Sequence, residues 1–241
     1  MYQPRTYRHW IKDKGLVSFN ATVKETDLYI RARRNLRAKA LEAIAKCRTP
    51  LEKYIESHPL FLSSLEPCSV DENAPSIVRE MAQAAEIVGV GPMAAVAGAI
   101  AEAVGKSLLA YSPEVIVENG GDIFMQISKT SLIGIYAGES SPFTGKIALE
   151  IGPEETPLGI CTSSETVGHS LSLGTADAII VLSHSTALAD AAATAIGNSV
   201  KIVEDITQVI ERAQIINGLT GVVIIKDDKM GVWGKVKIIS L

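Results

Sequence analysis

The sequence has few aromatic residues for its hydrophobicity. Aromatic residues make up 5% of the 241 positions, although 47% of the positions are hydrophobic. We therefore expect a core of Ile, Val, Leu and Ala, large enough for one large domain or two small ones. Because side chains that stack on bases are scarce and no RNA-binding motif is present, nucleic acid is not expected as a partner.

Cysteines and long hydrophobic runs are also scarce. The three cysteines, Cys47, Cys68 and Cys161, are odd in number and lack metal-ligand spacing, which argues against a disulfide framework and fits a reducing cytoplasm. The longest uncharged run in the Gly- and Ala-rich middle is 15 residues, 87–101. That run is shorter than the roughly 20 apolar residues of a membrane span, and no apolar signal core follows the N-terminus. These features predict a cytoplasmic protein without a membrane partner.

Basic residues are concentrated near the N-terminus. Residues 1–53 contain 13 Lys and Arg against 5 Asp and Glu, whereas the remainder contains 10 against 22. Such a segment suits an anionic ligand or the acidic surface of a partner subunit, and a homo-oligomer is expected. Arg31 and Arg34 lie where the first long helix is expected to begin, and cations there oppose the helix dipole. They are candidate anion-binding residues, or else long side chains that point into water.

Hydrophobic periodicity predicts an α+β protein. Strands are expected at 16–24 and from 28, and a helix at 33–57 that is interrupted near Pro50. Helices follow at 76–88 and 92–106. Further strands are expected at 115–117, 123–127, 131–136, 146–151, 158–162 and 178–182; helices are expected around Asp190 and at 206–216, and a terminal hairpin at 221–226 and 230–239. This order favours a mostly antiparallel sheet in two layers with helices packed on one face. It also suggests a single domain, 1–241, built from two strand-helix-strand halves of about 15–151 and 158–241.

The most informative stretch is Ala189-Asp190-Ala-Ala-Ala-Thr194-Ala-Ile-Gly197. Positions four apart share a helix face, so Asp190 and Thr194 point the same way from an Ala-rich and therefore buried helix. A buried carboxylate needs a partner. Their oxygens are ligands of the kind that Mg²⁺ prefers, which makes the pair a candidate metal site. The alternative is that Asp190 caps a neighbouring backbone N–H.

Two loops are candidates for binding a ligand. Asn119-Gly120-Gly121-Asp122 reads as a tight turn whose glycines allow positive φ and close approach of a ligand, although it also suits an ordinary hairpin. Thr162, Ser163 and Ser164 leave a strand as three consecutive hydroxyls, and Gly168-His169-Ser170 follows. A loop of this kind can bind phosphate or can simply be solvated.

Taken together and in order, these segments resemble the ApbE-like superfamily, which is named for a flavin-transferring protein. The residues that carry the resemblance are Val117–Ile123, Ile160–Ser164 and Ala189–Gly197. The match is closer to a short cytoplasmic branch found in archaea and bacteria. In that branch it also includes Glu25–Leu28, Tyr54-Ile55 with His58-Pro59, and Val90–Gly98, and it covers nearly the whole chain.

The resemblance implies a T-fold-like architecture and a site for a phosphate-bearing small molecule, FAD or FMN. It implies that Asp190 and Thr194 help to bind Mg²⁺. It also implies that the 119–122 turn and the loop with Thr162, Ser163, Ser164 and His169 lie against the flavin. In the transferases the enzyme moves FMN onto a protein threonine, with Mg²⁺ neutralising the pyrophosphate.

The chain departs from the transferases in two places. Their Pro-Arg-Thr-Gly-like stretch is replaced by Ser-Leu-Ser-Leu-Gly174 after His169, and their substrate-facing Ser/Arg motif is absent. The protein is therefore expected to have either an FMN-transferase-like activity or a divergent one. The alternative is a non-catalytic carrier or assembly factor in sulfur assimilation, in homocysteine formation. In that case Cys161 is either a reactive thiol or a structural buried cysteine.

Overall fold

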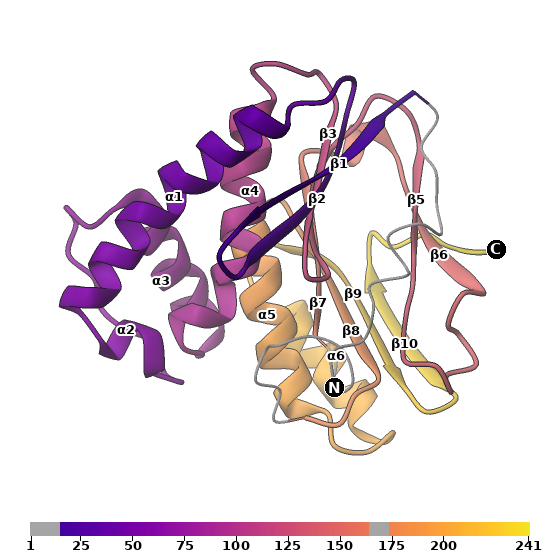
Figure 1. The fold of residues 1–241 in the computed structure, drawn as a ribbon. Coiled ribbons are helices and arrows are strands. Elements are labelled where there is room, and N and C mark those ends of the chain that lie inside the picture. Colours follow the sequence, from indigo (N-terminus) through magenta and orange to yellow (C-terminus); the bar gives the residue numbers. More distant parts are fainter. Residues whose placement is uncertain (1–14, 164–173) are drawn as a thin grey trace.

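An eight-stranded antiparallel sheet forms the centre of the molecule (Figure 1). The computed structural model describes residues 15–163 and 174–241. The strand order is β1-β2-β3-β4-β7-β8-β9-β10, with bounds Val17–Val23, Thr26–Ala32, Val115–Asn119, Asp122–Gln126, Leu158–Ser163, Ala178–Ser183, Leu219–Lys226 and Lys229–Gly234. A second sheet has the order β11-β6-β5, with bounds Ile238–Ser240, Ile147–Ile151 and Ser131–Gly134.

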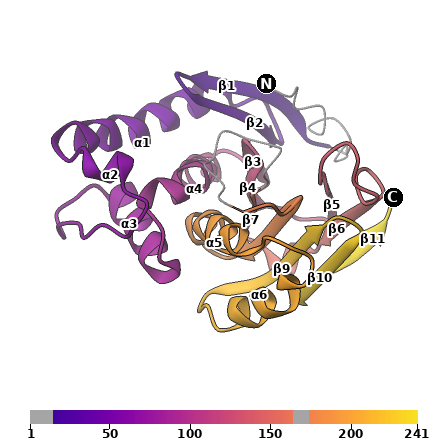
Figure 2. The ribbon, with the colours of Figure 1, turned by 90° about the horizontal axis from the view of Figure 1, so that it is seen from below.

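The helices cover one face of the large sheet and the small sheet covers the other, as Figure 2 shows. The helical layer consists of α1 (Arg37–Ser57), α2 (Leu60–Ser63), α3 (Ser76–Val88), η2 (Pro92–Ala95), α4 (Val96–Leu108), α5 (Thr186–Ser199) and α6 (Asp205–Gln214); a short turn, η3 (Pro153–Glu155), precedes β7. Each face of the large sheet has its own hydrophobic core. The predicted fold class, α+β with mostly antiparallel sheet and helices on one face, is confirmed.

The alternation of side chains along the strands explains the two cores. In β2, Leu28, Ile30 and Ala32 are buried against the helices, whereas Tyr29 and Arg31 point to the other face. The central strand β8 is buried along its whole length because both of its faces are covered. Aliphatic strands of this kind give the aromatic-poor core that the composition predicts.

The element order repeats along the chain. In the first part of the large sheet, β1 and β2 are followed by helices and then by β3 and β4. In the second part, β7 and β8 are followed by α5 and α6 and then by β9 and β10. The two parts join side by side where β4 pairs with β7, with Ile123 opposite Ile160. This seam lies beside the 119–122 turn.

Several elements differ from the sequence predictions. Helix α1 begins at Arg37, later than expected, and continues through Pro50, because Cys47 and Leu51 on either side of that proline stay buried on one helix face. The predicted terminal strand 230–239 is two strands: β10 ends at Gly234, where φ is +86°, and Ile238–Ser240 pairs instead with β6. The short helix α2 had no periodic signal because it is a single turn.

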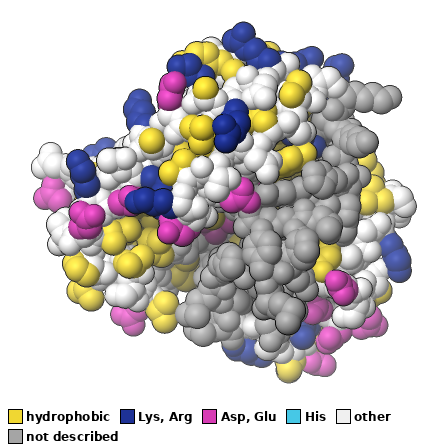
Figure 3. Space-filling model, viewed as in Figure 1, with side chains coloured by type: hydrophobic (Ala, Val, Ile, Leu, Met, Phe, Trp, Pro, Cys, Tyr) yellow, Lys and Arg dark blue, Asp and Glu magenta, His cyan; other side chains and the backbone are white. Residues whose placement is uncertain are grey.

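In the described parts of the chain, no single helix has the length and apolar character needed to cross a membrane. One bent pair, Ser76–Val88 with Pro92–Leu108, passes that test by length and composition, with a bend of 106°. Figure 3 shows Lys and Arg side chains on the surface over the β1–β2 hairpin and α1, which contain much of the described part of the basic segment 1–53.

Candidate functional site

The turn between β3 and β4 has the form that its sequence predicts. Gly120 and Gly121 have φ values of +70° and +109°, a conformation that favours glycine. Asn119 and Asp122 lie opposite each other in the strand register, and both are buried on the face that carries the helices. The Asn119 amide and the Asp122 carboxylate therefore lie side by side at the base of a turn formed by two glycines.

Hydrogen bonds tie this turn to the end of β7. The Thr162 backbone N–H donates to Asp122 Oδ1 at 3.2 Å, and Thr162 Oγ1 donates to the Gly121 carbonyl at 3.2 Å. The Gly121 N–H in turn donates to Glu118 Oε1 at 2.8 Å. Ser163 follows on the helix side and lies against Gly197 of α5. Of the predicted loop, the structure brings Thr162 to the turn and Ser163 to Gly197 of α5, while Ser164 and His169 lie outside the described residues.

The start of α4 is the third part of the site. Asn119 Nδ2 donates to the Ala97 carbonyl at 3.0 Å, and the Gly98 N–H donates to Asp190 Oδ2 at 2.8 Å. The first N–H groups of a helix have no partner within the helix, so Asp190 satisfies one of them from a neighbouring helix. One oxygen of Asp190 thus makes the backbone cap that the sequence left as the alternative to a metal.

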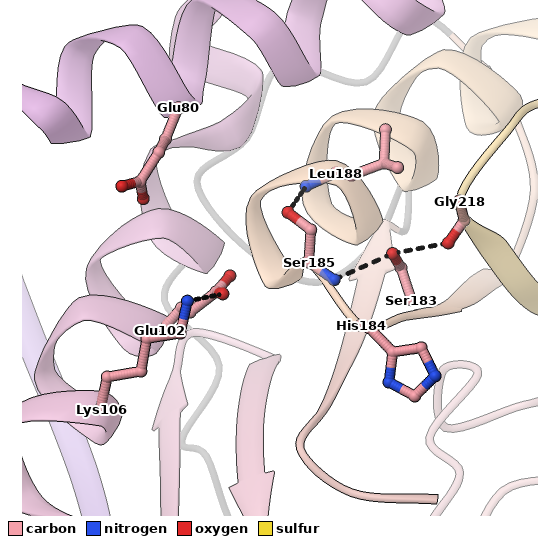
Figure 4. Close-up of a pocket in the computed structure, with 8 residues that line it drawn as sticks. All are labelled: Glu80, Glu102, Lys106, Ser183, His184, Ser185, Leu188 and Gly218. Atoms are coloured by element: carbon pink, nitrogen blue, oxygen red, sulfur yellow. Dashed lines mark hydrogen bonds and ion pairs between the residues drawn. The ribbon is translucent and has the colours of Figure 1, made fainter.

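Helices α4 and α5 cap each other. Glu102 Oε2 accepts the Thr186 N–H at the start of α5 at 2.7 Å, in the same way that Asp190 accepts the Gly98 N–H at the start of α4. The helices also approach closely, because a Cβ at Gly98 would lie 2.4 Å from the Thr186 carbonyl oxygen. Glu102 is not among the site residues predicted from the sequence; its signal is that it is the one carboxylate of α4, whose other charged residue is Lys106 (Figure 4).

The electrostatics of Asp190 are set by burial and by a second carboxylate. Burial raises the pKa of Asp190 well above its ordinary value, and the nearby negative charge of Asp122 raises this pKa further. Hydrogen bonds from the Gly98 and Ala97 N–H groups act in the opposite direction. Two buried carboxylates that repel each other favour a proton or a cation between them.

Thr194 lies one turn beyond Asp190 on the same face of α5 and is half-buried. Within the described residues its hydroxyl has no hydrogen-bond partner, so it remains available as a ligand. Among the residues that the structure describes, no group of three or more His, Cys, Asp or Glu side chains is arranged to hold a metal ion. A cation at Asp190 and Thr194 would therefore need water, backbone carbonyls or a ligand phosphate to complete its six oxygens.

Cys161 lies near Asp122 and Asp190 but is not exposed. Its thiol is fully buried, and Sγ donates to the Thr186 carbonyl at 3.4 Å. Burial, together with Asp122 and Asp190, raises the pKa of this thiol well above its usual value. Because the thiolate is the nucleophile, this environment favours the structural buried cysteine over the reactive thiol.

The prediction that Arg31 and Arg34 start a helix and bind an anion there is not supported. Arg31 is in β2 opposite Ile116, on the face of the sheet away from Asn119 and Asp122, and Arg34 is an exposed residue of the following connection. The helix begins only at Arg37, so Arg31 is not in its first turn, where the helix dipole acts.

Replacing Gly121 by alanine tests how tightly the turn is built. A Cβ at Gly121 would lie 2.6 Å from Thr162 Oγ1, and the residue would also be strained at φ +109°. We expect a loss of about 1–3 kcal/mol in the free energy of unfolding, measured by urea denaturation. Gly145→Ala is the matched control, since its φ of +68° is also positive but nothing lies within 4 Å of the new Cβ. A cost no larger than the control's would contradict the close contact.

The comparison with known sequences identifies the family. Residues 8–229 match the protein family described as AbpE bacteria. The chain belongs to this family. Its relatives include UPF0280 protein MJ1526 of Methanocaldococcus jannaschii, 44% identical over 220 residues, which are 89% of each chain. A UPF0280 protein of Methanocella arvoryzae is 42% identical over 214 residues, covering 88% of this chain and 86% of the relative. The ApbE-like resemblance read from the sequence is confirmed.

Solved structures share the fold of this AbpE family member at low sequence identity. The apo form of the flavinyl transferase ApbE of Pseudomonas stutzeri superposes with a TM-score of 0.59 at 15% identity, covering 90% of this chain and 93% of that one. The apbe protein of Thermotoga maritima gives a TM-score of 0.59 at 11% identity, covering 87% and 94%. At these identities the likeness establishes the architecture of the family member.

Proposed function

We propose that this protein binds a flavin nucleotide, FAD or FMN, together with Mg²⁺, at the edge where the 119–122 turn, the end of β7 and α5 meet. The observation that carries the proposal is the pair of buried carboxylates, Asp122 and Asp190, beside a turn of two glycines. A polyanionic ligand needs a cation between its phosphates and these carboxylates. A solved structure with this fold is a flavinyl transferase, which supports flavin as the ligand.

The residues fit such a group in complementary roles. Asp190 and Thr194 would hold the cation, and Asn119, Gly120, Gly121, Asp122, Thr162 and Ser163 would form the wall around the ligand; Ser164 and His169 are proposed from the sequence alone. Mg²⁺, when bound, neutralises the negative charge of a pyrophosphate. The glycines allow close approach because they place no side chain between the backbone and the ligand. We place this function in the cytoplasm, and include no transfer step because the motif after His169 differs from that of the transferases.

The test is a calorimetric titration of FMN and of FAD, with and without Mg²⁺. We expect Mg²⁺ to bind weakly alone and more tightly with the flavin, and the flavin to bind more tightly with Mg²⁺ by the same factor, because coupling between two ligands is reciprocal. Asp190→Asn removes the charge and keeps the shape, so it should abolish this coupling.

Asp228→Asn is the control for that titration. Asp228 is an exposed carboxylate paired with Lys229 in the turn between β9 and β10, and its loss should leave both affinities unchanged. Absence of flavin binding up to millimolar concentration would overturn the flavin assignment. Equal Mg²⁺ affinity in the original protein and Asp190→Asn would overturn the metal assignment.

A further inference from the structure

The large sheet ends in two edge strands, β1 and β10, which lie far apart in Figure 2. In the described parts of the chain β1 pairs only with β2, and β10 pairs only with β9, so each edge strand has one side without a neighbouring strand. Such a side exposes backbone N–H and C=O groups that can pair with another chain, and proteins usually cover or interrupt it. An edge that stays open is therefore a candidate interaction surface.

The edge formed by β1 is covered by a side chain. The β1–β2 hairpin has a two-residue turn between Val23 and Thr26, so these residues form a hydrogen-bonded pair and every second residue before Val23 faces β2. The Asn20 C=O therefore faces the outer side, and there Arg37 Nε donates to it at 3.2 Å. Arg37 is the first residue of α1, so this helix blocks the middle of the edge.

The edge formed by β10 is open. Its hairpin with β9 also has a two-residue turn, between Lys226 and Lys229. The same alternation directs the N–H and C=O groups of Met230 and Val232 to the outer side. Among the described residues no hydrogen bond from outside the β9–β10 hairpin reaches these groups. The strand also contains no proline that would interrupt pairing, so these groups can bind a further strand.

The side chains on one face of this edge are apolar and exposed. An added Cβ at Gly231 would meet Ile206 and Ile210 of α6, so Gly231 faces the helices. Side chains alternate along a strand, so Met230 and Val232 face the opposite side. Their exposed fractions are 37% and 42%. An open edge with exposed apolar side chains is the arrangement that associates with a second strand.

The two ends of β10 carry opposite charges. Asp227 and Asp228 form the turn before the strand and are exposed, and Lys235 is exposed just after the strand. Antiparallel pairing of two copies of β10 would place the acidic end of each strand beside the basic end of the other. Parallel pairing would place like charges together, which is unfavourable. The charges therefore favour a second copy of this chain, in the antiparallel direction.

We propose that β10 pairs with β10 of a second copy of this chain across a two-fold axis at Gly231. In this register Met230 exchanges backbone hydrogen bonds with Val232 of the partner subunit, and the two-fold axis repeats the pair. The exposed side chains of these two residues then cover each other. Asp227 lies beside Lys235 of the partner subunit. Such an interface uses the same surface of both copies, so it forms a closed dimer.

The helical layer extends this interface. Ile206 and Ile210 of α6 lie over Gly231, where the proposed axis passes, so the axis brings α6 of the two copies together on the helical side of the sheet. Ile210 is only half-buried within one chain and is covered further in the dimer. The dimer therefore continues both the sheet and the helical layer, and it buries more apolar surface than the strand edge alone.

Analytical ultracentrifugation of the whole chain tests the dimer. We expect a dimer at micromolar concentration, and we expect Val232→Pro to weaken it about tenfold or more, because proline removes the N–H that the partner strand accepts. The β9–β10 hairpin keeps its own hydrogen bonds, since this N–H faces the outer side. Ser18→Pro is the matched control: Ser18 is exposed in β1, its N–H also faces the outer side, and the variant should dimerise as the original protein does.

A charge reversal tests the antiparallel register without proline. Lys235→Glu places a carboxylate beside Asp227 of the partner subunit and should weaken the dimer about tenfold. Adding Asp227→Lys to the same chain should restore the dimer, because each reversed charge then meets a reversed partner. A change that only disturbs the hairpin would not be restored in this way.

Three results would overturn this proposal. The first is a protein that stays monomeric up to about 100 μM. The second is a dimer that resists Val232→Pro or is weakened as much by Ser18→Pro, and the third is no recovery in the double charge reversal. The residues of this edge lie outside the proposed flavin site, so Val232→Pro should bind flavin as the original protein does, and the two proposals can fail separately.

Discussion

Gly98→Ala should destabilise the protein by about 3 kcal/mol or more, although the same change in an exposed helix stabilises by about 1 kcal/mol. The new Cβ would lie 2.4 Å from the Thr186 carbonyl oxygen and 2.8 Å from Asp190 Cβ. Backbone atoms of α5 cannot rotate away as a flexible side chain can. The helices must therefore separate, and the hydrogen bond from Gly98 to Asp190 must lengthen with them.

Urea denaturation measures this effect, and Gly197→Ala is its matched control. Gly197 is in α5, and there the nearest atom to an added Cβ is Ser163 Oγ at 3.3 Å, the end of a side chain that can turn. The control should be near neutral, because the gain in helix propensity offsets slight crowding. If Gly98→Ala is as stable as this control, the two helices are not as close as described.

Asp190→Asn should stabilise the metal-free protein at neutral pH, on the order of 2 kcal/mol. A buried charge has an effective cost of several kcal/mol, and the hydrogen bond from Gly98 offsets part of it. Asparagine keeps an oxygen for that hydrogen bond and removes the repulsion from Asp122. Denaturation in the presence of a chelator measures the difference. Asp228→Asn should instead lose a little stability, because Lys229 lowers the pKa of Asp228 in the folded state.

The pH dependence of this effect has a defined sign. Because the pKa of Asp190 is raised in the folded protein, the folded state holds this proton to a higher pH than the unfolded state does. The stability of the metal-free protein should therefore fall as the pH rises from the ordinary Asp value of 3.8 through the raised pKa. In Asp190→Asn this fall should be absent. An identical pH profile in the two proteins would show that Asp190 is not the buried acid described here.

The sequence predicted the fold well because its core has clear periodicity. Alternation from 28 and the helical spacing of 76–88 each specify one buried face. The bounds of α3 are those predicted, whereas β2 begins at Thr26, two residues before the predicted start. The start of α1 was predicted too early because 33–35 contains no apolar residue that would fix where the helix begins. The final strand was misassigned because its pairing with β6 is a long-range choice. The local sequence pattern of a strand does not indicate which distant strand it pairs with.

The candidate site was predictable only in part. The residue types of the turn and the spacing of Asp190 and Thr194 are visible in the sequence, and the structure places the turn, Thr162 and α5 together. The contacts of Asp190 with Gly98, and of Glu102 with Thr186, were not predictable because they join residues 92 and 84 positions apart.

The exchange of caps between α4 and α5 has a consequence for how the chain folds. A carboxylate from each of these helices caps one N–H group at the start of the other. A fragment that stops between η3 and β7 would therefore lack the Asp190 acceptor of the Gly98 N–H, and its complement would lack the Glu102 acceptor of the Thr186 N–H. Neither fragment contains the carboxylate that caps its own helix. We therefore expect the halves to be stable only as a pair, so that a protein cleaved at this junction reassembles from both fragments and its amides exchange with solvent as one cooperative unit.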